Sequence, residues 1–233
     1  AMAIKTTVFS QITAPTEIAG ISAWWCADSV QQESGTPVSF WNNLVNATES
    51  VSQPVADNSP TLVKNVSEVN NHAVLRFDGN DYLDGGDILD VGNGISTILV
   101  GYTSKASGTF YAKNIMLTGG KNRYSMHYGA STKRPRLYTV VGSSEKYIMG
   151  HLDISNYILY SGIIDNKDGF LKFYQDTIMY VEKNSITSSF KSSYDFLIGA
   201  YNGSTGSIPP TDGYYLNGDI AEMIFYNRPL SNI

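Results

Sequence analysis

The sequence has little cysteine and histidine, with one cysteine and three histidines in 233 residues. A single thiol excludes an intramolecular disulfide, and we expect Cys26 to be a buried structural thiol. His72, His127 and His151 are scattered without the spacing of a zinc site. No apolar run approaches the roughly 18 residues of a membrane helix, and no N-terminal signal pattern is visible. We therefore expect neither a zinc cofactor nor membrane insertion.

Acidic residues are missing from a long central segment. The residues between Asp90 and Glu145 include seven of the 16 basic residues and none of the 21 acidic ones. The chain as a whole carries a net charge of -5 and has a pI near 5.1, which argues against a nucleic-acid partner. The basic segment is either a solvated edge balanced by acidic loops or a patch for an anionic partner.

Motifs for covalent catalysis and phosphate binding are also missing. The chain has no G-x-S-x-G turn, no histidine beside its cysteine, and no glycine loop that opens a helix. Nucleophilic catalysis and nucleotide binding are therefore not expected.

Short runs rich in Val, Ile, Tyr, Phe and Thr recur along the chain, separated by clusters of Gly, Asn, Asp and Ser. This pattern predicts an all-β fold of antiparallel strands, with a tight turn at Asp168-Gly169. Helix is expected only in turns or in one short segment around Phe40 to Val45. The predicted strands are residues 73–77, 96–104, 123–128, 136–141, 157–164, 170–175, 177–182, 195–201 and 221–227.

Several motifs occur in an order typical of one superfamily. They are "ISAWWCADS", "VSFWNNL", "AVLRFDGNDYLDGG", "STILVGYTS", "FLIGAYNGS" and "YYLNGDIAEMIFYNRPLS". The chain resembles, over about residues 20 to 232, the laminin-G-like branch of the concanavalin A-like lectin and glucanase superfamily. The resemblance implies a two-sheet antiparallel jelly-roll sandwich formed by a single domain at 20–233. Residues 1–19 are expected to be a leader or first strand that opens on "AMA", a typical cloning remnant.

The resemblance implies a carbohydrate-binding, lectin-like module of the kind found in phage tail, virion and bacterial surface proteins. Its partners would be a bacterial or host surface polysaccharide and other subunits of a larger fibre, at an extracellular or virion surface. Alternatives are a structural or protein-interaction domain of a virion and, less favoured, a polysaccharide lyase or glycoside hydrolase. The tryptophans of the matching motifs, Trp24, Trp25 and Trp41, are expected to lie in the core.

The paired-carboxylate motif of the glucanase relatives, E-x-D-x-E, is absent. Its period-2 spacing would place carboxylates on one sheet face at the separation that retaining hydrolysis needs. Asp219 and Glu222 lie three residues apart, so we expect them on opposite faces of a strand, with Glu222 in structural hydrogen bonds. The sequence therefore predicts a protein that is not an enzyme.

The basic segment contains a predicted hairpin over residues 122–141. Strand alternation places Arg123 and His127 on the face opposite Tyr124, Met126 and Tyr128.

In the second strand of this hairpin, Arg136 and Tyr138 alternate with Leu137. Pairing His127 with Arg136 puts the polar residues of both strands on one exposed face. Pairing Tyr128 with Arg136 would place those of the two strands on opposite faces. We adopt the first register. The ligand-binding candidates, including the rim loop near residue 200, are Arg123, His127, Arg136, Tyr138, Tyr201, Asn202 and Tyr214.

An acidic stretch, "FDGNDYLDGGDILD", offers oxygen ligands for a hard cation. It lacks the order of an EF-hand loop, and in the resembled family its Phe-Asp-Gly forms a turn. The candidate calcium ligands are Asp78, Asp81 and Asp84, and no other cofactor is expected.

Overall fold

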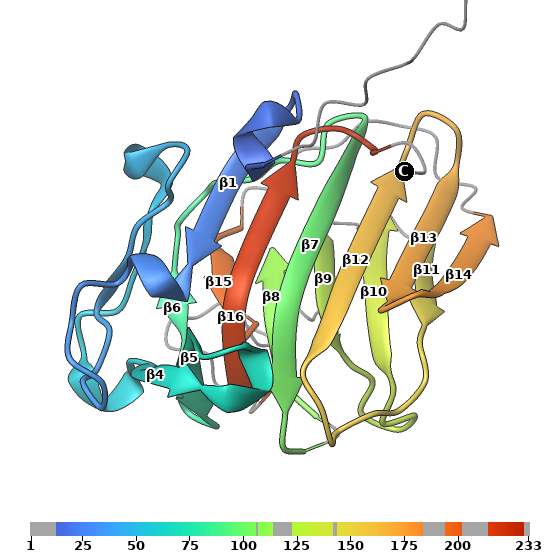
Figure 1. The fold of residues 1–233 in the computed structure, drawn as a ribbon. Helices are drawn as coiled ribbons and strands as arrows, with labels where there is room; N and C mark the ends of the chain where they lie inside the picture. The colour runs from blue at the N-terminus through green and yellow to red at the C-terminus, as the bar shows by residue number, and fades with distance from the viewer. Residues whose placement is uncertain are drawn as a thin grey trace, which may run out of the picture.

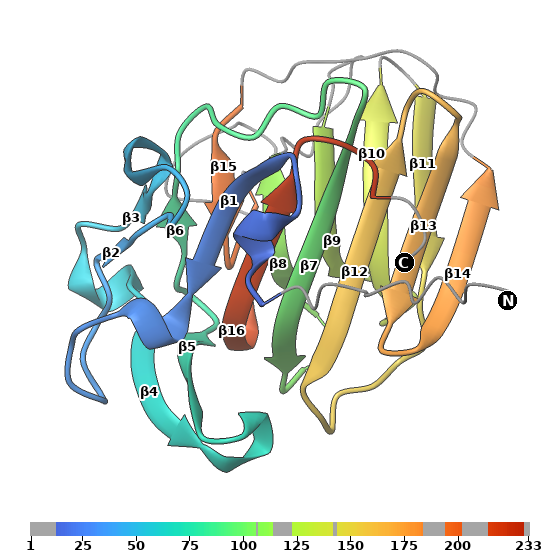
Figure 2. The ribbon, with the colours of Figure 1, turned by 45° about the horizontal axis from the view of Figure 1, so that its top comes forward.

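The computed structural model describes residues 13–105, 107–113, 123–141, 144–183, 194–201 and 214–230. Their strands form two antiparallel sheets that face one another, shown in two views in Figures 1 and 2. The fold is the all-β, two-sheet sandwich that the sequence predicts.

Sheet A forms the front layer in Figure 1 and contains the first and the last described strands. Its strand order is β14-β13-β12-β7-β16-β5-β4, and β1 pairs with β16 beside this path. The strands of sheet A are β1 Ile21–Cys26, β4 Thr61–Val66, β5 His72–Asp78, β7 Gly94–Thr103, β12 Ile158–Asp165, β13 Phe170–Gln175, β14 Ile178–Lys183 and β16 Asn217–Tyr226.

Sheet B lies behind sheet A, with the strand order β11-β10-β9-β8-β15-β6-β3-β2. Its strands are β2 Phe40–Trp41, β3 Val51–Ser52, β6 Leu83–Asp84, β8 Thr109–Lys113, β9 Arg123–Tyr128, β10 Pro135–Val141, β11 Ser144–Met149 and β15 Phe196–Ile198. The helices among the described residues are single 3-10 turns: η1 Pro15–Glu17, η2 Ala27–Ser29, η3 Ala47–Glu49, η4 Ala56–Asn58 and η5 Ser67–Val69.

Aromatic side chains from both sheets fill the centre of the sandwich. Trp25 of β1 stacks on Phe196 of β15 with ring centroids 5.8 Å apart. Phe225 of β16 contacts Tyr111 of β8 at 5.0 Å and Phe196 at 5.4 Å, both edge to face. Such rings combine large buried apolar areas with favourable edge contacts. The sheets are therefore joined through a continuous apolar core.

Two of the three tryptophans match the predicted core. Trp25 and Trp41 have no exposed surface, whereas Trp24 is half-buried on the outer face of sheet A. Its Nε1 donates to Oε1 of Glu222 at 2.7 Å, which is the structural role expected for this glutamate. Cys26 is half-buried as well, and this partial burial raises the pKa of its thiol.

One local expectation is wrong. Residues 40–45 contain β2, because Phe40 and Trp41 pair with β3, and they form no helix. Residues 13–19 contain η1, and the rest of the predicted leader or first strand, residues 1–12, lies outside the described residues. The predicted tight turn is present between β12 and β13, where the amide of Gly169, at φ +72°, donates to the carbonyl of Asp165.

A β-bulge in β16 overturns the prediction for Asp219 and Glu222. The pairing with β7 shifts register between Ile220 and Glu222, so Ala221 is the extra residue. An extra residue reverses the alternation beyond it. Ile220 faces the core, whereas Asp219 and Glu222 both lie on the outer face of sheet A.

Candidate functional site

A cavity of about 330 Å³ opens on the outer face of sheet B, over strands β9 and β10. We call it the arginine cavity. Because β9 and β10 are joined by a short hairpin loop, their outward side chains lie side by side on its floor. The lining residues are Arg123, His127, Ala130, Ser131, Arg136, Tyr138, Glu145, Tyr201 and Tyr214.

Six of the seven predicted ligand-binding residues line this cavity, and Asn202 lies outside the described residues. The register is the adopted one, with His127 opposite Arg136 and Ser125 opposite Tyr138. The expectation of an exposed face is wrong, because His127 and Tyr138 are each only 6% exposed. The ring of Tyr201 contacts that of His127 at 6.4 Å and contributes to this burial.

His127 forms the hydrogen-bonded centre of the cavity floor. Nε of Arg136 donates to its Nε2 at 2.7 Å. Because arginine has no acceptor, Nε2 is unprotonated and the ring proton is on Nδ1, which donates to Oγ of Ser125 at 2.8 Å. Burial, together with the charges of Arg136 and Arg123, lowers the pKa of His127 to about 3. The imidazole is therefore neutral at pH 7 and holds Arg136 in place.

Tyr138 connects the second guanidinium to the single carboxylate of the described lining. Its hydroxyl accepts a hydrogen bond from Nη2 of Arg123 at 2.8 Å and also bonds to Glu145. Burial raises the pKa of Tyr138. The guanidinium carbons of Arg123 and Arg136 each lie 5.5 Å from the centre of its ring, within cation–π range.

Aromatic rings lie beside the arginines. Tyr201 and Tyr214 stack with centroids 4.6 Å apart, and Tyr147 of β11 lies 5.4 Å from the guanidinium of Arg136. Flat rings of this kind offer apolar faces to a sugar, and a guanidinium is a bidentate partner for a carboxylate. The bond to His127 uses only Nε of Arg136, and within the described residues no hydrogen bond is made by its terminal nitrogens, which could therefore donate to a ligand.

Sequence reasoning missed Glu145, because residues 144–149 were not predicted as a strand. The signal was present, since Glu145 is the first carboxylate after the basic segment. In β11 it lies opposite Val140 and reaches the cavity.

The calcium candidates do not converge. Among the residues that the structure describes, no three His, Cys, Asp or Glu side chains are grouped to hold a metal ion. Asp81 accepts the amide of Asp78 at 2.8 Å, and Asp84 accepts that of Gly86 at 2.8 Å. Such bonds are those of acidic residues that stabilise turns. Calcium binding by Asp78, Asp81 and Asp84 stays a prediction.

A lysine neutralises the last acidic residues of the same stretch. Lys113 is fully buried, and its Nζ donates to Asp87 at 2.7 Å, to the carbonyl of Ile88 at 2.6 Å and to Asp90 at 3.3 Å. A buried ammonium is tolerated only with such partners. Lys113 therefore belongs to the folded core and leaves the basic patch with one charge fewer than the sequence suggests.

Several solved structures share this fold. Domain 4 of AbnA, a GH43 extracellular arabinanase from Geobacillus stearothermophilus solved with arabinotriose, is 16% identical with a TM-score of 0.53, and the match covers 91% of this chain and 94% of that domain. Trypanosoma rangeli sialidase is 12% identical with a TM-score of 0.56, over 92% of this chain and 32% of the sialidase. Domains LG4-5 of the mouse laminin alpha1 chain are 12% identical with a TM-score of 0.51, and the match covers 68% of this chain and 43% of the laminin chain.

These likenesses show the sandwich fold alone. The chain spans 26% of the length of several other sialidase structures that it matches, including NanB of Streptococcus pneumoniae. No protein-family model and no curated protein matches the sequence. No helix in the described parts of the chain is long and apolar enough to cross a membrane.

Proposed function

We propose that this chain is a non-catalytic carbohydrate-binding module, and that the arginine cavity holds a carboxylate-bearing sugar of a surface glycan. The observation that supports this most is the combination, in one cavity, of two arginines fixed in orientation and of stacked tyrosines. The fixed guanidinium of Arg136 would bind the carboxylate, and Tyr201 and Tyr214 would contact the apolar face of the ring.

Binding is favoured over catalysis by the occupied proton-transfer groups. Nε2 of His127 accepts from Arg136, so this nitrogen has no lone pair left for a substrate proton. Glu145 is the one carboxylate among the described lining residues, and glycoside hydrolysis ordinarily uses two. Release of reducing ends or of unsaturated uronates from polysaccharide substrates would overturn this part of the proposal.

The setting that we propose is a phage tail, virion or bacterial surface protein, in which such modules are common in the resembled family. There the glycan would be a bacterial or host surface polysaccharide, and other subunits of the fibre or surface protein would flank the module. A purely structural virion domain is the alternative, and it predicts that the cavity is covered by a neighbouring subunit and binds no sugar.

The test compares uronate-containing or sialylated polysaccharides with their carboxyl-reduced forms on an array. We expect binding to the acidic forms and at least a tenfold loss on carboxyl reduction, since a charge-assisted hydrogen bond contributes about 1.5–3 kcal/mol. Absence of binding to every glycan would contradict carbohydrate recognition, and equal binding to reduced forms would contradict the carboxylate.

Arg136→Gln provides the residue-level test. It removes the guanidinium that His127 orients, and we expect it to weaken binding about tenfold or more. Lys133→Gln is the matched control, because Lys133 lies in the exposed loop of the same hairpin and does not line the cavity. Equal losses in both variants would indicate a general charge effect and not a site.

A further inference from the structure

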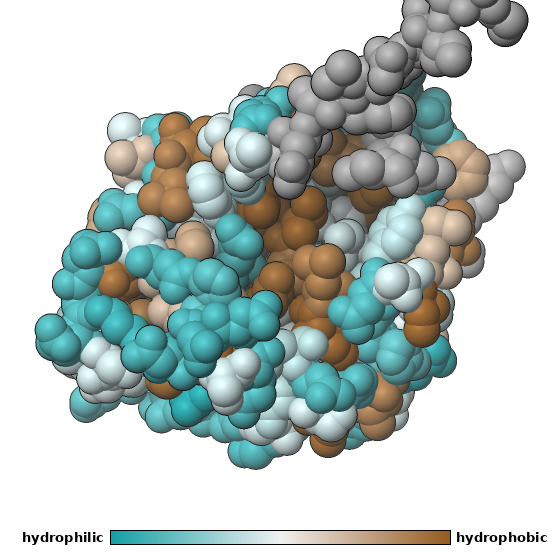
Figure 3. Space-filling model, viewed as in Figure 1, coloured by the Kyte–Doolittle hydropathy of each residue, from teal (hydrophilic) through white to brown (hydrophobic). Residues whose placement is uncertain are grey.

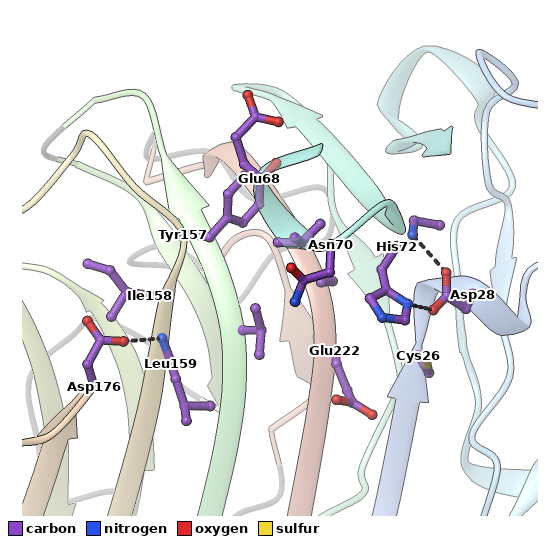
Figure 4. A pocket seen from close by; sticks show the side chains of 14 residues that line it. Cys26, Asp28, Glu68, Asn70, His72, Tyr157, Ile158, Leu159, Asp176 and Glu222 are labelled. Carbon is purple, nitrogen blue, oxygen red and sulfur yellow. Dashed lines mark hydrogen bonds and ion pairs between the residues drawn. The ribbon is translucent and has the colours of Figure 1, made fainter. Parts of the chain in front are cut away.

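A second, larger cavity of about 570 Å³ lies on the outer face of sheet A, on the opposite side of the sandwich from the arginine cavity. We call it the acidic groove; Figure 4 shows its side chains. Its lining comes from six separate segments of the chain. The lining residues are Cys26, Asp28, Glu68, Val69, Asn70, His72, Ala73, Val100, Tyr157, Ile158, Leu159, Asp176, Ala221 and Glu222.

The floor of the groove is apolar although it faces outward. Val100 of β7 and Ala221 of β16 lie in an outer-face apolar cluster with Val69 of η5, and Leu159 of β12 is 44% exposed. Figure 3 shows apolar residues gathered in the middle of this face. A cleft of this size with an apolar floor and a few polar groups has the character of a ligand pocket.

The polar groups of the groove are mostly anionic. Four carboxylates line it, and no described lining residue is a lysine or an arginine. The nearby guanidinium of Arg76 is committed to Asp219, with bonds of 2.9 and 2.8 Å. His72 is held by Asp28 through Nδ1 at 2.6 Å. The groove therefore complements a positive charge.

Two of the carboxylates are fixed in position by the fold. Oδ1 of Asp176 accepts the amide of Leu159 at 3.0 Å, and Oε1 of Glu222 accepts Nε1 of Trp24 at 2.7 Å. Within the described residues, their second oxygens have no such bond. Figure 4 shows Asp176 beside Leu159 on one side and Glu222 toward the side of His72. The apolar floor thus lies between two oriented anions.

We propose that the acidic groove binds a small organic cation, an ammonium group on an apolar body. The body would contact Val100, Leu159 and Ala221, and the ammonium would donate to Asp176 or Glu222. A charged hydrogen bond beside an apolar surface is stronger than one in open water, so the two features reinforce each other. The proposal does not depend on glycan binding, because the two cavities share no residue.

The test uses hexylamine, with hexanol and hexanoate as neutral and anionic probes of the same length. Binding is measured by calorimetry and mapped by shifts of backbone amide resonances. We expect hexylamine to bind at least tenfold more tightly than either analogue and to shift Val100, Leu159 and Ala221. Equal affinities for the three probes, or shifts confined to other residues, would overturn the proposal.

The double variant Asp176→Asn with Glu222→Gln removes both charges while keeping an acceptor for Leu159 and Trp24. We expect a tenfold or greater loss of hexylamine affinity. Asp168→Asn, in the exposed β12–β13 turn, is the matched control and should bind as the wild type does. Unchanged affinity in the double variant would overturn the assignment.

The source of the cation is distinguished by two further probes. Cadaverine represents a free amine, and Nα-acetyl-lysine methylamide represents the lysine side chain of a protein. Tighter binding of either one identifies the source, and failure of both to compete with hexylamine would contradict the proposal.

Discussion

The arginine cavity and the acidic groove lie on the outer faces of opposite sheets and are assembled in different ways. The first is built mainly on one hairpin, β9–β10, and its polar groups are bonded to one another. The second collects residues from six segments around an apolar floor, and its carboxylates are held by backbone and indole donors. The polar side chains of the arginine cavity hold one another in position. In the acidic groove, two carboxylates are instead held by a backbone amide and an indole of sheet A.

Deleting Ala221 should disrupt the acidic groove, and of the variants considered it should lower the stability of the fold most. Without the bulge, either Asp219 or Glu222 would turn into the sandwich. Because Asp219 is buried and paired with Arg76, we expect a loss of roughly 3 kcal/mol or more in the free energy of unfolding. Urea denaturation measures it, and Ala221→Gly, which keeps the bulge, is the control. A deletion variant as stable as the wild type would contradict the role of the bulge.

Acidification should act through the arginine cavity. The folded pKa of His127 is about 3, below the roughly 6.5 of an unfolded histidine, so the unfolded state takes up the proton first. The contribution of His127 to stability is therefore complete above about pH 6.5 and is lost as the pH falls toward 3.

We expect the free energy of unfolding to fall between pH 7 and pH 4.5 by more in the wild type than in His127→Gln. His72→Gln, in the lining of the acidic groove, is the control. It keeps His127, so its free energy of unfolding should fall over this pH range by more than that of His127→Gln. Denaturation at the two pH values gives the comparison, and identical losses in the wild type and His127→Gln would rule out this contribution.

Trp24→Phe tests how the acidic groove is oriented. It removes the donor to Glu222 while keeping an aromatic ring, and we expect a loss of about 1 kcal/mol in stability. Hexylamine affinity should fall by a few fold, because Glu222 is no longer fixed, and glycan affinity should not change. Calorimetry with both ligands separates the two sites, and a parallel fall in both affinities would mean that they are coupled.

Tyr214→Leu tests the aromatic side of the arginine cavity and should have the smallest effect on stability. It removes the ring stacked on Tyr201, and because Tyr214 is only half-buried we expect a loss of about 0.5 kcal/mol, the low end for an aromatic pair. We expect glycan binding to weaken by up to about tenfold and hexylamine binding to stay unchanged. Unaltered glycan affinity would exclude this tyrosine as a sugar platform.

The contrast between the cavities also explains what could be predicted from the sequence. Alternation within one hairpin determines which side chains share a face, so Arg123, His127 and Arg136 were predicted together, and their register was correct. The burial of His127 was not predicted, because it depends on contact with Tyr201, which is 74 residues away in the chain. The pattern of residues within one hairpin carries no information about a contact with such a distant residue.

The acidic groove was not predicted at all. Its residues come from six separate segments of the chain, and no spacing connects them. Strict alternation along a strand predicts Asp219 and Glu222 on opposite faces. The bulge at Ala221 interrupts the alternation and brings both residues to the same face. The overall sandwich was predictable because it rests on many short apolar runs, each of which tolerates local irregularity.

The difference in charge between the two cavities has a consequence for the approach of a charged ligand. The hairpin of sheet B carries Arg123, Arg136 and the exposed Lys133, whereas the outer face of sheet A carries the four carboxylates of the groove. If the proposed acidic glycan is the ligand, its charge would favour approach toward the arginine cavity over approach toward the acidic groove. The rate of association should then fall with added salt more steeply than the rate of dissociation changes.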